Sequence, residues 1–201
     1  TKGQYSPTSE RGKVTKSTPF GSPDSPLNPM LFALSAGATF IARTFDVDTK
    51  GMQDVLNEAA KHKGTSFVEI YQNCNIFNDG TFAAINDRSA REDRILRLNH
   101  GKPFIFGKEQ NKGIRLNGLK PEVVDLRDGV NENELLTHDQ FNNDSTLANL
   151  LSGFDYPEFP VPMGILRQVD NSTYEETIEQ QIKMQIDEKG AGDLAALLRG
   201  S

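Results

Sequence analysis

The sequence predicts an α/β fold in which helices cover a parallel sheet. Helical and strand patterns alternate along its first regular region: helix 30–35, strand 38–44, helix 49–63 and strand 66–71. The second helix gives the clearest signal, because Met52, Val55 and Leu56 recur at helical spacing. A helix of this length between two strands is typical of the crossover that joins parallel neighbours.

Local signals support each of these elements. Asn28 is a favourable N-cap, Pro29 suits the first helical position and Gly37 ends the first helix. Asp48 caps the second helix, which Gly64 terminates. His62, near the end of that helix, is expected on the surface, where the helix dipole favours a partial positive charge.

The rest of the chain is less regular. Between residues 79 and 130 the predicted elements are a helix capped by Ser89 and running through 95–97, followed by strands at 104–106, 114–116 and 123–126. Beyond residue 130 they are helices at 132–141 and 145–154, a strand at 163–168, an amphipathic helix at 173–188 and a short helix at 194–198. The three short strands and their polar turns predict a small antiparallel β element. It is appended to the α/β domain and begins a C-terminal α+β extension.

Residues 1–27 are rich in proline, glycine, serine and threonine, so neither helix nor strand should persist there. One interpretation is a flexible tail. The other is a loop that covers a cofactor, in which lysine and arginine side chains among hydroxyl groups would suit a phosphate or carboxylate. The segment is not a P-loop, because Gly12-Lys13 is followed by Val14.

Composition restricts the class of protein. The formal net charge of −6 argues against nucleic acid as the main partner. No apolar run reaches the roughly 18 residues of a membrane helix, and no signal peptide is recognisable. A single cysteine suits a reducing compartment. A soluble cytoplasmic protein is expected, and the start at Thr1 predicts a fragment or a processed piece.

Cys74, the only cysteine, follows the strand 66–71 in a turn rich in asparagine. Loops after the carboxyl ends of strands commonly hold ligands in α/β proteins. The thiol can be a metal ligand, a nucleophile or a small buried side chain. His100 and His138 stand apart in polar surroundings, and no complete catalytic or metal-binding motif is present.

Several blocks together resemble one family: Thr1-Lys-Gly-Gln-Tyr-Ser-Pro-Thr-Ser, Thr15-Lys-Ser-Thr-Pro-Phe-Gly, Asn28-Pro29, Gly37-Ala-Thr-Phe-Ile-Ala-Arg43, His62-Lys-Gly-Thr-Ser-Phe-Val-Glu-Ile and Cys74-Asn-Ile-Phe-Asn78. The chain resembles the β subunit of 2-oxoacid:ferredoxin oxidoreductases, in particular the 2-oxoglutarate type. The resemblance is dense over residues 1–80 and looser beyond, and it corresponds to the C-terminal two thirds of such a subunit.

This resemblance implies a thiamine diphosphate-binding fold, a bound Mg²⁺ and a 4Fe–4S cluster. It also implies an α subunit, coenzyme A and ferredoxin as partners. The reaction would be oxidative decarboxylation of a 2-oxoacid to acyl-CoA, with electrons leaving through the cluster. By resemblance Cys74 is one of four cluster ligands, and the other three are absent.

The resemblance also implies roles for the first four residues of the chain. Thr1, Lys2, Gly3 and Gln4 would lie near thiamine diphosphate, with Lys2 meeting the substrate carboxylate, although a solvated loop lysine is an alternative. The Gly-Asp-Gly motif that holds magnesium and the asparagine after it are absent. The expected division is a cofactor-proximal loop at 1–27, the C-terminal part of the thiamine diphosphate-binding domain at 28–90, and a subunit-interaction region at 91–201.

Two alternatives remain open. The chain could be a catalytically inert structural or subunit-interaction piece, in which the helix at 173–188 and the proline-rich segment 157–162 pack on a partner. It could also belong to a pyruvate-type relative, because the side-chain pocket of the substrate lies largely in the α subunit.

Overall fold

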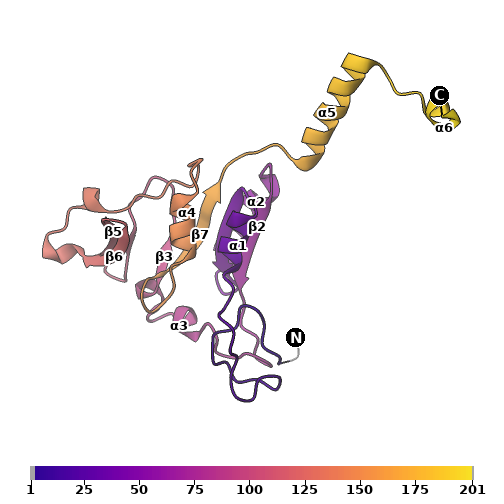
Figure 1. The fold of residues 1–201 in the computed structure, drawn as a ribbon. Helices are drawn as coiled ribbons and strands as arrows, with labels where there is room; N and C mark the ends of the chain where they lie inside the picture. The colour runs from indigo at the N-terminus through magenta and orange to yellow at the C-terminus, as the bar shows by residue number, and fades with distance from the viewer. Residues whose placement is uncertain (1–2, 201) are drawn as a thin grey trace.

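A computed structural model describes residues 3–200. Its elements form one four-stranded sheet in the order β2-β1-β7-β3 and one three-stranded sheet in the order β4-β5-β6 (Figure 1). The larger sheet carries the candidate site, and the smaller sheet lies beside it.

The centre of the larger sheet is the predicted crossover unit. β1 (Phe40–Phe45) and β2 (Ser66–Tyr71) pair in parallel, with Arg43 opposite Glu69. α2 (Thr49–Lys61) joins them, and the Asp48 carboxylate caps it by accepting the Gly51 N–H at 3.0 Å. The α/β prediction is therefore confirmed for this unit.

The sheet as a whole is mixed. β7 (Val161–Gln168) runs antiparallel to β1 and parallel to β3 (Ile95–Arg97). β1 and β2 precede residue 90 and β3 and β7 follow it, so strands that are distant in sequence complete this sheet.

The helix predicted from Ser89 through residues 95–97 is wrong. Only a 3-10 turn, η1 (Arg91–Asp93), forms before β3. Ile95 and Leu96 are each 1% exposed and enter separate hydrophobic clusters, as successive side chains on a strand do. The charged residues around them resembled the polar face of an amphipathic helix.

α1 (Pro29–Ser35) and α4 (Thr146–Ser152) lie together beside the sheet. The side-chain oxygen of Asn28, Oδ1, accepts the Met30 and Leu31 N–H groups, each at 3.1 Å. The side-chain nitrogen of Asn28, Nδ2, donates to the Ser152 carbonyl at 2.7 Å. One side chain therefore caps α1 and joins it to the end of α4.

The smaller sheet confirms the predicted antiparallel element. It consists of β4 (Ile105–Phe106), β5 (Lys112–Asn117) and β6 (Lys120–Asp125). Two further short helices are α3 (Ala83–Asn86) and η2 (Leu126–Asp128).

The helix predicted at 132–141 is wrong, because only η3 (Glu132–Glu134) forms there. The chain then runs beside the smaller sheet, with isolated bridges from Leu135 to Arg115 and from Thr137 to Pro103. Leu135, 7% exposed, is buried in this extended conformation.

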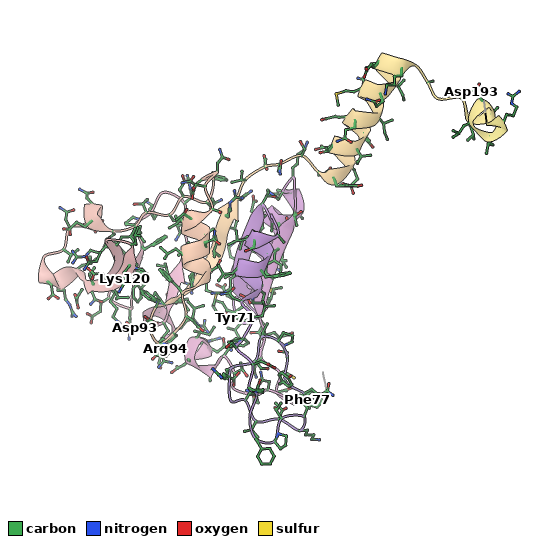
Figure 2. All side chains as sticks on the ribbon, in the orientation of Figure 1. Tyr71, Phe77, Asp93, Arg94, Lys120 and Asp193 are labelled. Carbon is green, nitrogen blue, oxygen red and sulfur yellow. The ribbon has the colours of Figure 1, made fainter. Side chains whose placement is uncertain are left out.

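α5 (Tyr174–Lys189) and α6 (Leu194–Arg199) confirm the two C-terminal helices. Both project away from the sheets, at the opposite end of the molecule from residues 3–27 (Figure 1). Neither helix has a buried residue. Their side chains point outward (Figure 2).

Candidate functional site

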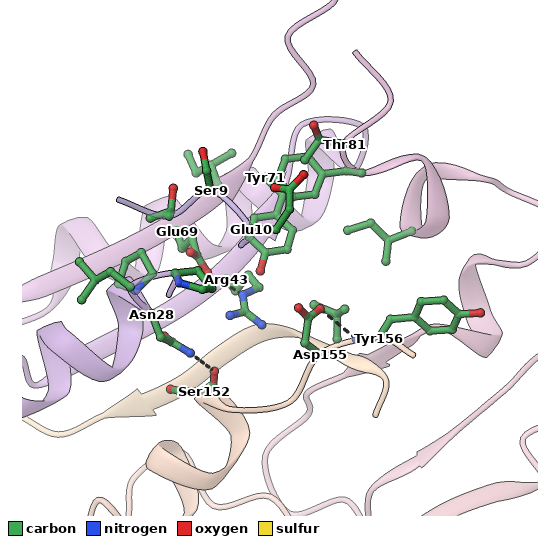
Figure 3. A pocket seen from close by; sticks show the side chains of 18 of the residues that line it. Ser9, Glu10, Asn28, Arg43, Glu69, Tyr71, Thr81, Ser152, Asp155 and Tyr156 are labelled. Atoms are coloured by element: carbon green, nitrogen blue, oxygen red, sulfur yellow. Dashed lines mark hydrogen bonds and ion pairs between the residues drawn. The ribbon is translucent and has the colours of Figure 1, made fainter. Parts of the chain in front are cut away.

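A cavity of about 760 Å³ opens where β1 and β2 end (Figure 3). It is bounded by the N-terminal loop, the start of α1, β2, the segment around α3 and the turn after α4. The carboxyl ends of parallel strands are the usual ligand-binding edge of α/β sheets. The cavity is therefore our candidate site.

Its floor is built by two strands with matching patterns. Ile41 lies opposite Phe67, Arg43 opposite Glu69, and Phe45 opposite Tyr71. Ile41 and Phe67 belong to one hydrophobic cluster, whereas Phe45 and Tyr71 belong to a second. The charged pair thus interrupts an apolar stripe at the point where these two clusters separate.

Arg43 and Glu69 form a short ion pair, with 2.7 Å between Nε and Oε2. Their side chains are 4% and 17% exposed. Nη1 of Arg43 is buried and has no hydrogen-bond partner among the described residues. Because an unpartnered buried donor is costly, the arrangement favours an oxygen acceptor from a ligand or another segment.

Aromatic side chains form the adjoining wall. The Arg43 guanidinium lies 5.0 Å from the centroid of the Tyr71 ring, and Tyr71 stacks on Phe82 with a 4.4 Å centroid separation. Burial raises the pKa of Tyr71 to about 12. Its phenol is therefore protonated at neutral pH and able to donate a hydrogen bond.

Four residues of the N-terminal loop also line the cavity: Ser6, Thr8, Ser9 and Glu10 (Figure 3). The loop folds back on itself, since the Gly12 N–H donates to the Ser22 carbonyl at 2.7 Å and the Leu27 N–H donates to Pro7 at 2.8 Å. Lys13 lies 2.8 Å from Glu10 and, as the leading cause, lowers the pKa of its carboxyl. The segment is an ordered wall of the cavity.

The predicted cofactor-proximal residues are only partly placed. Thr1 and Lys2 lie outside the described residues, so their predicted roles remain predictions. Gly3 has φ +85°, and a Cβ there would lie 3.3 Å from the Phe77 ring. The structure thus brings Gly3 against the turn that carries Cys74, whereas neither Gly3 nor Gln4 lines the cavity.

Cys74 is exposed and free, at the start of a tight turn. The Asn78 N–H donates to the Cys74 carbonyl at 2.9 Å, and Asn78 also lines the cavity. Backbone N–H groups, led by those of Phe77 and Ile76, hold the pKa of the thiol below its ordinary value. Such donors favour a thiolate and suit a sulfur ligand of a metal or cluster.

The described residues do not hold a metal centre by themselves. Within residues 3–200 no group of three or more histidine, cysteine, aspartate or glutamate side chains is arranged to bind an ion. A 4Fe–4S cluster requires four ligands, and the chain contains one cysteine. Cys74 can supply one of them, so the fit to a cluster is incomplete without another segment.

His62 and His138 are buried, whereas the sequence predicts a surface position for His62 and polar surroundings for His138. The His62 side chain is fully buried, not on the surface, and its Nε2 shares a 2.8 Å hydrogen bond with the Thr39 hydroxyl. His138, 1% exposed, pairs through Nε2 with the Ile165 carbonyl at 2.8 Å. Burial lowers the pKa of both imidazoles. His100 remains half-exposed, with its Nδ1 3.5 Å from Asp139.

Sequence reasoning missed Arg43, Glu69 and Tyr71. The signal was present, because each of two neighbouring strands places one charged residue between two apolar or aromatic ones. Opposite charges in matching positions indicate a cross-strand pair. The strand register needed to recognise the match is a tertiary property.

Comparisons with known proteins identify relatives. No protein-family model matches the chain. It is 43% identical over 183 residues to "2-oxoglutarate oxidoreductase subunit KorB" of Mycobacterium tuberculosis, a match covering 90% of the chain and 48% of that protein. It is 37% identical over 99 residues to "2-oxoacid:ferredoxin oxidoreductase subunit beta" of Sulfolobus sp, covering 49% of the chain and 31% of that protein.

A solved structure shares the fold. It is a 2-oxoglutarate:ferredoxin oxidoreductase from Magnetococcus marinus with 2-oxoglutarate, coenzyme A and succinyl-CoA bound. The TM-score is 0.62 at 23% identity, and the match covers 97% of this chain and 50% of that one. This likeness supports the expected thiamine diphosphate-type α/β fold.

Among the described helices, none is both long enough and apolar enough to cross a membrane. The chain spans about half the length of the M. tuberculosis relative, rather than the two thirds expected from its sequence. Within that span, the sequence similarity and the shared fold confirm the resemblance to the β subunits of 2-oxoacid:ferredoxin oxidoreductases.

Proposed function

We propose that the chain forms part of the β subunit of a 2-oxoglutarate:ferredoxin oxidoreductase. The complete complex would decarboxylate a 2-oxoacid oxidatively with coenzyme A and pass electrons to ferredoxin. The observation that carries the proposal is 43% identity along 90% of the chain to a 2-oxoglutarate oxidoreductase subunit. A cytoplasmic location belongs to the same proposal, since a single cysteine suits a reducing compartment.

The proposed cofactors belong to the intact subunit. When bound, thiamine diphosphate would supply the electron sink that decarboxylation of a 2-oxoacid needs. This chain lacks the Gly-Asp-Gly motif for magnesium and three of the four cysteines for a cluster. Its own contributions would be Cys74 as one cluster ligand, residues 1–4 beside thiamine diphosphate, and Lys2 as a point charge for the substrate carboxylate.

The cavity supports a ligand-binding role for this end of the sheet. Nη1 of Arg43 is a donor with no partner within residues 3–200, and the Tyr71 phenol is protonated at neutral pH. Its wall at residues 6–10 continues directly from the segment proposed to lie near the cofactor. The Asn78 side of the cavity belongs to the Cys74 turn.

The first alternative is a catalytically inert subunit-interaction piece. α5, which has no buried residue, favours it, as does the incomplete set of cluster ligands. The second alternative is a pyruvate-type relative. Relatives named only for 2-oxoacids leave the substrate open, so comparing turnover of 2-oxoglutarate and pyruvate by the assembled complex decides between them.

The test of the proposed function is Cys74→Ser in the complete complex, reduced and examined by low-temperature electron paramagnetic resonance. We expect loss of the 4Fe–4S signal, because serine replaces a thiolate ligand. Asn75→Ser, an exposed change in the same turn, is the matched control and should keep the signal. An unchanged signal in Cys74→Ser removes the cluster assignment. Absence of 2-oxoacid-dependent ferredoxin reduction in the wild-type complex removes the enzymatic proposal.

A further inference from the structure

α5 carries one apolar stripe that nothing among the described residues covers. Ile178, Ile182 and Ile186 recur every four residues and therefore lie on one face of the helix. Ile182 and Ile186 are 53% and 47% exposed. With Gln181 and Gln185 they line a shallow, open depression of about 540 Å³ that continues to Gly190 and Gly192.

The sequence nevertheless strongly specifies a helix here. The Thr173 hydroxyl accepts the Glu176 N–H at 3.2 Å, and the Glu176 carboxylate accepts the Thr173 N–H at 3.1 Å. Glu175 and Glu176 lie in the first turn and Lys189 in the last, as the helix dipole favours. Isolated helices of about this length are marginal in water. A well-capped helix with an exposed isoleucine stripe is therefore built for a partner.

The charge of α5 indicates what that partner looks like. The helix contains five acidic and two basic side chains, a net charge of −3, and the whole chain has a net charge of −6. Glu175 and Glu179 are exposed on the border of the isoleucine stripe. A second copy of this chain would bring like charges together. A different protein with an apolar groove and a basic rim is complementary.

We infer that α5 docks through Ile178, Ile182 and Ile186 into a basic-rimmed apolar groove on another subunit of the same complex, the proposed α subunit. The inference rests on the proposed function for the identity of this partner. Its geometry rests on the helix alone. The relatives are named as subunits, so partner chains of their own are implied by those names. α6 continues the docking segment with Leu194, Leu197 and Leu198, which are 69%, 75% and 78% exposed.

The experiment compares variants of the full chain for retention of the co-expressed α subunit. Ile182→Ser with Ile186→Ser removes the stripe. Met184→Ser is the matched control, because Met184 is 60% exposed on another face of the same helix. We expect the double variant to bind at least about tenfold more weakly and Met184→Ser to bind like wild type. Circular dichroism should show the same helix content in all three chains.

The rim is tested separately by Glu175→Lys with Glu179→Lys. Charge reversal should slow association with the α subunit and weaken its salt dependence. The inference is overturned if the Ile182→Ser, Ile186→Ser variant binds the α subunit as tightly as the wild-type chain does. It is also overturned if the wild-type chain alone sediments as a dimer and this variant as a monomer, because a second copy would then occupy the stripe.

Failure of this inference can be distinguished from failure of the proposed function. A complex that retains its cluster signal and 2-oxoacid turnover with the serine variants disproves docking through α5 and leaves the function intact. A wild-type chain that retains no α subunit overturns the inference, whereas the cluster signal tests the function independently of α5.

Discussion

The Arg43 guanidinium makes an ion pair through one nitrogen and leaves another nitrogen unpaired within residues 3–200. Its Nε is paired with Glu69 and its guanidinium lies over Tyr71, yet Nη1 has no partner among the described residues. The cation is anchored through Nε, while its buried Nη1 keeps an unused donor on a residue that lines the cavity. This arrangement separates a structural contribution, the pair with Glu69, from a ligand-binding contribution.

The two contributions respond differently to mutation. Arg43→Met should lower the free energy of unfolding by about 3 kcal/mol, because the Glu69 carboxylate is left largely buried without its partner. Arg43→Met with Glu69→Leu should recover most of that loss, since an apolar pair extends the stripe formed by Ile41 and Phe67. Urea unfolding of the three chains measures both effects. A double variant as unstable as the single one would show that the pair is not the source of the loss.

At the scale of elements, the joint between α2 and β2 is the most constrained connection. Gly64 has φ +122°, and a Cβ there would lie 2.3 Å from the Thr39 hydroxyl oxygen. That hydroxyl also accepts the Thr65 N–H and shares a hydrogen bond with His62. Gly64 therefore serves backbone conformation and close packing at once.

Gly64→Ala should consequently lower the free energy of unfolding by about 3 kcal/mol or more, through the clash with Thr39 and the strained φ. Gly37→Ala is the matched control. Gly37 has φ +88°, and apart from its own chain neighbours no atom of the described residues lies within 4 Å of its Cβ position, so only the backbone cost of about 1 kcal/mol applies. Thermal or urea unfolding compares the two variants. Equal losses of unfolding free energy in the two variants would mean that the Thr39 and His62 side chains rearrange around the new methyl group without destabilising the fold.

On the scale of the whole molecule, two sheets form the body and α5 with α6 stand apart from it (Figure 1). A single exposed ion pair, Lys63 to Glu176 at 3.3 Å, is recorded between α5 and the body within the described residues. Exposed pairs of this kind contribute little to stability. The body and the C-terminal helices are therefore expected to be energetically independent in the isolated chain.

Removal of residues 173–201 should change the free energy of unfolding of the body by less than about 1 kcal/mol. Urea unfolding monitored by tyrosine fluorescence measures this. Removal of residues 161–201 is the contrasting truncation, because it deletes β7 from between β1 and β3 and should abolish cooperative unfolding. A large loss on removing residues 173–201 would show that α5 packs on the body.

Short-range sequence signals were sufficient to predict the elements that such signals specify. Asn28 and Pro29 begin α1, Asp48 begins α2, and Thr173 begins α5, because a cap acts on backbone groups within one turn. Alternating helix and strand patterns likewise sufficed for the parallel pair β1 and β2. The position of Cys74 after β2 was also predicted, since a loop at the carboxyl end of a strand follows from chain order.

The way in which distant segments meet became visible only in the folded chain. Ile95 and Leu96 belong to a strand because two hydrophobic clusters on opposite faces receive them, and Leu135 is buried without a helix because the smaller sheet covers it. The pairing of Arg43 with Glu69, and the closing of the cavity by residues 6–10, depend on register and on contacts across the chain. Burial and pairing are relations between segments, whereas propensity and capping are properties of a few neighbouring residues.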